Sequence, residues 1–377
     1  MKRIVSIVLA VLFSLSVFAL VGCGNINDTD VVILWKDEGV ATNPNSLINS
    51  MDRAMYIEKV GYVHMGAKGN ADEQLKQAKE AVESGCAALV VELINPLHAQ
   101  EIVESAKAKE IPVVFIDTLQ LVPDAVVASY DKCAVVRADM TTVAEVQGEL
   151  LATYVKDNYK TLDKKDADGK TDGKITCIAT DFGLISDAAV KKANELLATE
   201  DYQVNPNEIW EFWKPKTNTS IELVDNAVVE FNSIDPATLE MILTPDDHIA
   251  FTVLQALQEK DYNTDKLTTH FVPVITVGDS VDYKAYVVEQ GKEHYGENKF
   301  LVDLTVVDEA DLNEMIYTTR NVVGAGRLAG TVIADDDAIA GAVAKIVRNL
   351  IKEKDMFDGI EGVDGKTVKI RYIALTE

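Results

Sequence analysis

Short apolar runs recur along this chain between segments whose apolar residues follow helical spacing, and this alternation constrains the fold more than any other feature. The runs are rich in Val, Ile and Leu without polar alternation, which is typical of strands covered on both faces. Strands that alternate with helices favour a parallel sheet flanked by helices, and therefore an α/β fold. The runs that predict strands are Val31–Trp35, Gly61–Met65, Ala87–Glu92, Ile111–Asp117, Ala134–Val136, Lys174–Thr180, Glu208–Trp213, Met241–Leu243 and Val272–Gly278.

Length and charge limit the class of protein. The 377 residues exceed the usual size of one domain, and two α/β units of similar build follow one another, so we expect two domains. Hydrophobic residues make up 47% of the chain, enough for two cores. The formal net charge of −25 gives a surface that repels nucleic acid and anionic lipid headgroups. The composition therefore predicts a globular protein with no nucleic-acid partner.

The N-terminus has the features of an export signal. Lys2 and Arg3 precede an apolar run from Ile4 to Val21, and Gly22-Cys23 follow it. The sequence Leu-Val-Gly-Cys resembles the lipobox of bacterial lipoproteins. That resemblance implies a signal peptide over residues 1–22, a lipid on Cys23 and a polar tether over residues 23–30. The alternative is a transmembrane anchor with an incidental cysteine, because the apolar run is about long enough to span a bilayer.

The remaining cysteines and the histidines form no cluster that indicates catalysis or a metal site. Cys86 and Cys177 border or occupy apolar strands, where cysteine packs as a small hydrophobe. With Cys133 they make three, without a CxxC pair, so we expect no disulfide framework and no zinc site. The five histidines are scattered and no catalytic motif is present. The sequence therefore predicts a protein that is not an enzyme and has no cofactor.

A family resemblance appears at Ala78–Asp117, where CAALVVELINP leads into a helix and then into IPVVFID. This order resembles the type I periplasmic sugar-binding proteins, and the nearest branch is the one that binds glucose and galactose. The resemblance implies two Rossmann-like lobes with parallel sheets, joined by a three-strand hinge. Four later segments extend it over nearly all of the mature chain: Ser129–Ala152, Asp172–Leu197, Leu328–Ile351 and Asp364–Thr376.

The resemblance also implies domain boundaries. Lobe 1 is expected to hold residues 31–138 and 334–355, and lobe 2 residues 139–333 and 356–377. The hinge crossings then fall near Ala138-Asp139, Ile333–Asp335 and Lys354–Phe357. In open parallel sheets, ligands bind beyond the carboxyl ends of the strands. We therefore expect a ligand between the facing lobes, buried by hinge closure.

A sugar requires planar polar side chains at its rim and aromatic rings against its faces. The resemblance places such residues at the strand ends. Glu38 is an alternative to Asp37, and Trp210 is an alternative to Trp213. Trp35 is equally well explained as a core residue, and the other two tryptophans could instead pack in the core or at an interface. The candidate ligand-binding residues are Trp35, Asp37, Asp117, Asp187, Lys191, Trp213, Asp247 and Asp279.

Several positions depart from the family pattern. Lys191 stands where the family has an arginine, and lysine lacks the guanidinium fork. Pro245, Ile185 and Ala334 replace polar family residues. The ligand is therefore not fixed, and the surplus of aspartates also suits an amino or cationic ligand. A calcium loop of some relatives aligns with Asp168–Gly173, but Lys170 occupies a ligand position and repels the ion, so calcium has little support.

Together these features predict a lipid-anchored solute-binding protein at the outer side of the cell membrane, in a periplasm or at the cell surface. Its expected partners are a small ligand such as galactose or glucose, an ABC transporter permease, and the bilayer through the N-terminal lipid. Two alternatives stay open. The chain could be a sensing subunit for a chemoreceptor or sensor kinase, or it could bind a nucleoside or an amine.

Overall fold

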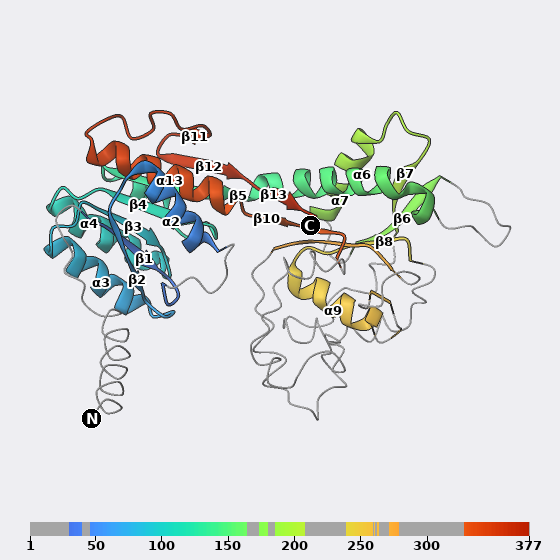
Figure 1. Ribbon diagram of the computed structural model, residues 1–377, viewed down its shortest axis with the longest axis horizontal. Helices are drawn as coiled ribbons and strands as arrows, with labels where there is room; N and C mark the ends of the chain where they lie inside the picture. Colours follow the sequence, from blue (N-terminus) through green and yellow to red (C-terminus); the bar gives the residue numbers. More distant parts are fainter. Residues whose placement is uncertain are drawn as a thin grey trace, which may run out of the picture. The chain divides into compact units, whose positions relative to one another are not determined.

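In the computed structural model the chain divides into two compact units (Figure 1). Unit 1 comprises Met1–Ala138 and Asp335–Ile370, and unit 2 comprises Asp139–Ala334 and Arg371–Glu377. The structure describes residues 30–39, 46–163, 173–179, 185–207, 239–258, 260, 262–263, 271–278 and 328–376.

Unit 1 is built on a seven-stranded sheet in the order β11-β12-β5-β4-β3-β1-β2. The paired strands from β5 to β2 run parallel, and β11 pairs with β12 antiparallel. Every residue of β1 and β4 is buried, which explains why their sequences are apolar without alternation. The strands are β1 (Val31–Trp35), β2 (Tyr62–Gly66), β3 (Ala88–Glu92), β4 (Val113–Asp117), β5 (Cys133–Asp139), β11 (Val363–Asp364) and β12 (Thr367–Arg371).

Helices cover both faces of this sheet. The helices α3 (Ala71–Glu83), α4 (Ala99–Ala108) and α5 (Asp124–Ala128) share one core with β1, β3, β4 and β5. The helix α2 (Leu47–Glu58) packs against α13 (Asp336–Ile351), which contacts β3 and β4. Asn70 and Asp335 cap α3 and α13 through their side-chain oxygens, each accepting from a backbone N–H of the first turn.

Unit 2 contains a six-stranded sheet in the order β13-β10-β9-β8-β6-β7, parallel except for β13 against β10. The long helix α6 packs closely on α7 because Gly148 of α6 has no side chain. A Cβ at this position would lie 2.5 Å from the carbonyl oxygen of Ala189 in α7. The elements are η2 (Met140–Thr142), α6 (Val143–Leu162), β6 (Lys174–Ala179), α7 (Ile185–Leu196), β7 (Gln203–Asn207), β8 (Met241–Leu243), α9 (Asp247–Gln258), β9 (Val274–Val277), β10 (Gly330–Ile333) and β13 (Ile373–Leu375).

The predicted fold class, α/β with two mostly parallel sheets, is confirmed. The expected third crossing near Lys354–Phe357 is displaced, because residues 356–370 belong to unit 1. Val135 N of β5 donates to Lys366 O at 3.0 Å, a distance typical of a β-sheet hydrogen bond. Val368 of β12 is fully buried. The chain therefore extends the first sheet before it passes to unit 2 at Arg371. The strand β7 lies earlier than the run Glu208–Trp213, which is outside the described residues.

The three cysteines are free and buried, as predicted for Cys86 and Cys177. Burial raises the pKa of Cys86 and of Cys133 to about 12, well above that of an exposed thiol. We expect a thiol reagent such as DTNB to leave all three unmodified in the folded protein at pH 8, because the thiolate is the reactive form. Denaturant should expose them at once, and rapid labelling of the folded chain would contradict this placement.

The same shifts set a pH dependence. A thiol of the unfolded chain ionises near pH 9, whereas the buried thiols stay protonated to about pH 12. Because the unfolded state loses its protons first, the free energy of unfolding contributed by these groups falls as the pH rises through that window.

Candidate functional site

The carboxyl ends of the unit 1 strands meet at one edge of the sheet, where polar side chains gather. The strands β5, β4, β3, β1 and β2 are neighbours in that order, so their last residues form a row. Two ion pairs join residues in or next to this row. Arg137 pairs with Asp117 across β5 and β4, and Glu92 at the end of β3 pairs with Lys36, directly after β1.

Trp35, a predicted stacking residue, lies in the core of unit 1 with 2% of its surface exposed. Its Nε1 donates to Nδ1 of His64 at 2.7 Å, and Nε2 of His64 lies 2.7 Å from Oδ1 of Asp52. An indole N–H can only donate, so Nδ1 of His64 accepts and Nε2 carries the hydrogen bonded to Asp52. This placement matches the alternative interpretation of Trp35 as a core tryptophan, and its contact with a ligand stays a prediction.

Asp37, the second candidate, is exposed on the loop after β1. Backbone hydrogen bonds tie this loop to the one after β2: Lys68 N donates to Asp37 O at 3.0 Å, and Gly69 N donates to Lys36 O at 2.7 Å. Gly66, the last residue of β2, lies against the loop after β1, and a Cβ at this position would lie 2.1 Å from the carbonyl carbon of Glu38. The position of Asp37 at the edge therefore depends on the absence of a side chain at Gly66.

Lys36 and Glu92 were missed by the sequence analysis. Nζ of Lys36 lies 3.1 Å from Oε1 of Glu92, whose side chain is only 12% exposed. Burial acts to lower the pKa of Lys36, but the charge of Glu92 and the hydrogen bond to it outweigh this, and the net shift is upward. The buried Gln74 fixes the end of β3 by donating to Glu92 O and accepting from Ile94 N. The one signal in the sequence was an acidic residue that closes the apolar run ALVVE.

Asp117 is the centre of a second cluster. It is 3% exposed, and its carboxylate accepts from Leu121 N at 2.6 Å and Val122 N at 3.2 Å. Nε of Arg137 donates to it at 2.8 Å, while the other guanidinium nitrogens donate to Asp124 and to the carbonyl of Val122. Asp117 thus holds the loop after β4 in place, and its predicted contact with a ligand stays a prediction.

Arg137 is a second residue that the sequence analysis missed. Burial acts to lower the pKa of its guanidinium, but hydrogen bonds to Asp117 and Asp124 outweigh this, and the net shift is upward. A permanently charged side chain inside the run CAVVRAD is the signal that could have indicated a buried ion pair, because an unpaired charge is costly there.

In unit 2, Asp247 follows β8 and begins α9 with 2% of its surface exposed. Gly278, directly after β9, approaches it so closely that a Cβ would lie 3.0 Å from Cγ of Asp247. Oγ1 of Thr331 donates to Gly278 O at 2.7 Å and ties this turn to β10. The carboxyl edge of the second sheet thus also holds a candidate carboxylate, that of Asp247. It packs against Gly278, whose φ of +110° is one that residues with a side chain rarely adopt.

Asp187 and Lys191 lie one helical turn apart near the start of α7, which follows the carboxyl end of β6, and both are exposed. The structure brings these two together as predicted, but no result tests their contact with a ligand. Trp213 and its rival Trp210, Asp279, Cys23 and the loop with Lys170 lie outside the described residues.

Neither a metal cluster nor a membrane span is found in the part of the chain that the structure describes. No group of three or more His, Cys, Asp or Glu side chains there could hold a metal ion. None of the helices in the same ranges is both long and apolar enough to cross a bilayer.

Comparisons with known proteins agree with this architecture. A family model described as "Periplasmic binding protein domain" matches residues 51–355. AraP, an arabinose binding protein from Geobacillus stearothermophilus, superposes with a TM-score of 0.52 at 11% identity, covering 93% of this chain and 97% of that one. A chain of a mutant XylFII-LytSN complex gives a TM-score of 0.51 at 13% identity, covering 93% of this chain and 98% of that one. At such identities the two structures are evidence of a shared fold alone.

Proposed function

The chain belongs to the family of periplasmic binding protein domains, and from this membership we propose that it captures a monosaccharide outside the cytoplasm and delivers it to an ABC transporter permease. The observation that carries the proposal is the family match over residues 51–355, which spans both units. Members of this family are extracytoplasmic solute-binding proteins rather than enzymes, which supports a role in capture without catalysis.

The polar strand ends support a sugar as the ligand. Asp37 and Asp187 are exposed next to the carboxyl edges of the two sheets, where ligands of open α/β folds bind. Carboxylates accept hydrogen bonds from hydroxyl groups, and the carboxyl edge of unit 1 also holds the Lys36–Glu92 pair as a second source of charged donors and acceptors. The arabinose ligand named for the Geobacillus protein adds pentoses to galactose and glucose as first compounds to test.

The anchor is part of the same proposal. The lipobox-like sequence before Cys23 supports lipidation of that cysteine, which would hold the protein at the outer side of the cell membrane. This location is consistent with delivery of the ligand, because the family is extracytoplasmic and the proposed permease lies in the same membrane.

A thermal-shift screen tests the proposal. A ligand at one hundred times its dissociation constant adds roughly 2.7 kcal/mol to the free energy of unfolding, so the melting temperature rises. We expect galactose, glucose or a pentose to raise it for the mature protein. If only nucleosides or amines do so, the sugar assignment is wrong, and if no small molecule does so, capture of a solute is refuted.

The same screen on two variants tests the site. Asp187→Ala should lower the ligand-dependent shift without lowering the melting temperature of the free protein, because Asp187 is exposed. Glu195 is also an exposed acidic residue, two turns further along α7, so Glu195→Ala is the matched control and should keep the full shift. Equal shifts in both variants would exclude Asp187 from the site.

A further inference from the structure

The edge of the unit 1 sheet opposite the candidate site is where the chain enters the fold. Asp30 precedes β1, and its carbonyl accepts from Ala87 N at 2.9 Å, while Val31 N donates to Gly61 O at 2.9 Å. These bonds place the end of the tether beside the starts of β2 and β3. We call this side, with the residues that precede the parallel strands and the last turns of α2 and α13, the amino-terminal edge of unit 1.

We propose that the amino-terminal edge of unit 1 is a membrane-contact surface that rests on the bilayer to which the chain is anchored. The inference rests on the proposed lipid at Cys23. It goes beyond the anchor itself, because it assigns a second contact to the folded protein and names the face that makes it.

Three exposed apolar side chains lie at this edge. The helix α2 runs back from the carboxyl edge and ends here, with Tyr56 82% exposed and Ile57 71% exposed. Ile351 at the end of α13 is 41% exposed, and the ion pair of Arg348 with Glu58 joins the two helix ends. Tyrosine and large aliphatic residues are the side chains that enter the boundary between lipid headgroups and acyl chains.

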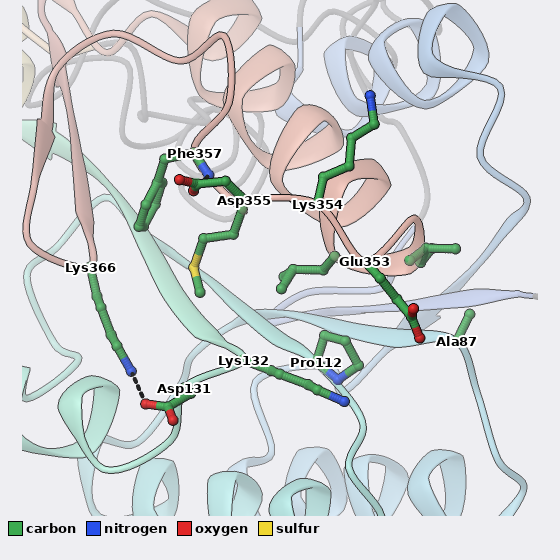
Figure 2. Close-up of a pocket in the computed structure, with 12 residues that line it drawn as sticks. Ala87, Pro112, Asp131, Lys132, Glu353, Lys354, Asp355, Phe357 and Lys366 are labelled. Carbon is green, nitrogen blue, oxygen red and sulfur yellow. Dashed lines mark hydrogen bonds and ion pairs between the residues drawn. The ribbon is translucent and has the colours of Figure 1, made fainter.

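The charges of this edge suit a lipid surface better than those of the whole chain. A hollow of about 730 Å³ lies at the same edge, between the residues that precede β3, β4, β5 and β12 and the segment after α13. Figure 2 shows the residues that line it. Apolar side chains line part of it, including Leu350, Met356 and Phe357. Its charged residues balance, with Lys132, Lys354 and Lys366 against Asp131, Glu353 and Asp355.

This local neutrality matters because the chain carries a net charge of −25, which anionic headgroups repel. A hollow lined by equal numbers of cationic and anionic side chains is repelled less than a uniformly acidic surface. The exposed Lys354 is long enough to reach a headgroup phosphate while its aliphatic stem covers apolar surface.

The length of the tether decides which face the membrane meets. The seven residues from Gly24 to Asp30 hold the start of β1 within about 25 Å of Cys23, at roughly 3.5 Å per extended residue. A unit of this size is roughly 40 Å across. The amino-terminal edge is therefore the part of unit 1 that the lipid keeps nearest to the bilayer. Because the anchor makes the contact intramolecular, a few apolar side chains are sufficient for it.

An environment-sensitive fluorophore tests this surface in the full lipidated chain. Tyr56→Cys is labelled and the protein is reconstituted on vesicles of phosphatidylcholine and phosphatidylglycerol. The buried native cysteines should not react. The matched control is Leu97→Cys, since Leu97 is 80% exposed but lies in η1 (Pro96–His98) after the carboxyl end of β3. We expect a blue shift and quenching by spin-labelled lipid for the probe at position 56, and neither for the probe at position 97.

The outcomes separate the surface from the anchor. If the chain floats with the vesicles while both probes keep the emission they have in buffer, the anchor stands and the contact surface is refuted. If the chain does not float, lipidation itself is refuted and the surface falls with it. A blue shift at position 56 that vanishes when the protein is diluted at constant lipid would identify a second copy of the chain as the occupant, and would overturn the proposal.

Discussion

Replacing Gly66 with alanine is expected to destabilise unit 1 by about 3 kcal/mol, at the upper end of the range for overpacking. The new Cβ would lie 2.1 Å from the carbonyl carbon of Glu38, 2.2 Å from its oxygen and 2.5 Å from the carbonyl oxygen of Asp37. All three are backbone atoms, so no flexible side chain can move aside. The loop after β1 must lift from β2, and its hydrogen bonds with Lys68 and Gly69 are lost or weakened.

Thermal and urea unfolding measure the loss of stability in Gly66→Ala. Because the displaced loop carries Asp37, the variant should also lose affinity for the ligand, and the ligand-dependent thermal shift measures that loss. Gly341→Ala is the matched control: the same methyl group is added in the same unit, inside α13, where nothing lies within 4 Å. It should stabilise the helix by up to about 1 kcal/mol. Equal stability of the two variants would show that the loop does not rest on Gly66.

The strands could be predicted from the sequence because burial on both faces leaves little freedom in composition. The runs VVILW and VVFID are buried along their whole length, and any polar residue within them would need a partner in the sheet. The end of unit 1 was placed too early for a different reason. The strand β12 lies next to the edge strand β11 and mixes buried and exposed residues, so its sequence does not identify which of two sheets it joins.

The candidate site was predicted less completely, because sequence position gives the strand end but not the direction of the side chain. Asp117 lies at the predicted strand end, yet its carboxylate turns inward to Arg137 and to the backbone of its own loop. Trp35 likewise ends β1 but is held in the core by His64, 29 residues away. Such pairings connect distant residues, and neither propensity nor periodicity contains them.

The ion pair of Arg137 with Asp117 should therefore be a large contributor to the stability of unit 1. Arg137→Met keeps an unbranched apolar stem but removes the guanidinium and its charge. It leaves the carboxylate of Asp117, whose side chain is 2% exposed, without a cation. We expect the free energy of unfolding to fall by about 3 kcal/mol, since breaking a buried pair from one side leaves an uncompensated charge. Calorimetry or urea unfolding measures the loss.

Neutralising the partner should reverse much of that loss. Asp117→Asn retains an acceptor for Leu121 N and Val122 N, so the double variant with Arg137→Met should be more stable than Arg137→Met alone. Arg53→Met is the control for an exposed pair: Arg53 lies 2.6 Å from Asp337, with side chains 54% and 73% exposed, and its loss should cost less than about 1 kcal/mol. If Arg53→Met and Arg137→Met cost the same, or if Asp117→Asn adds to the loss, the carboxylate of Asp117 does not depend on Arg137. Asp117 would then be free to face a ligand, as the sequence first suggested.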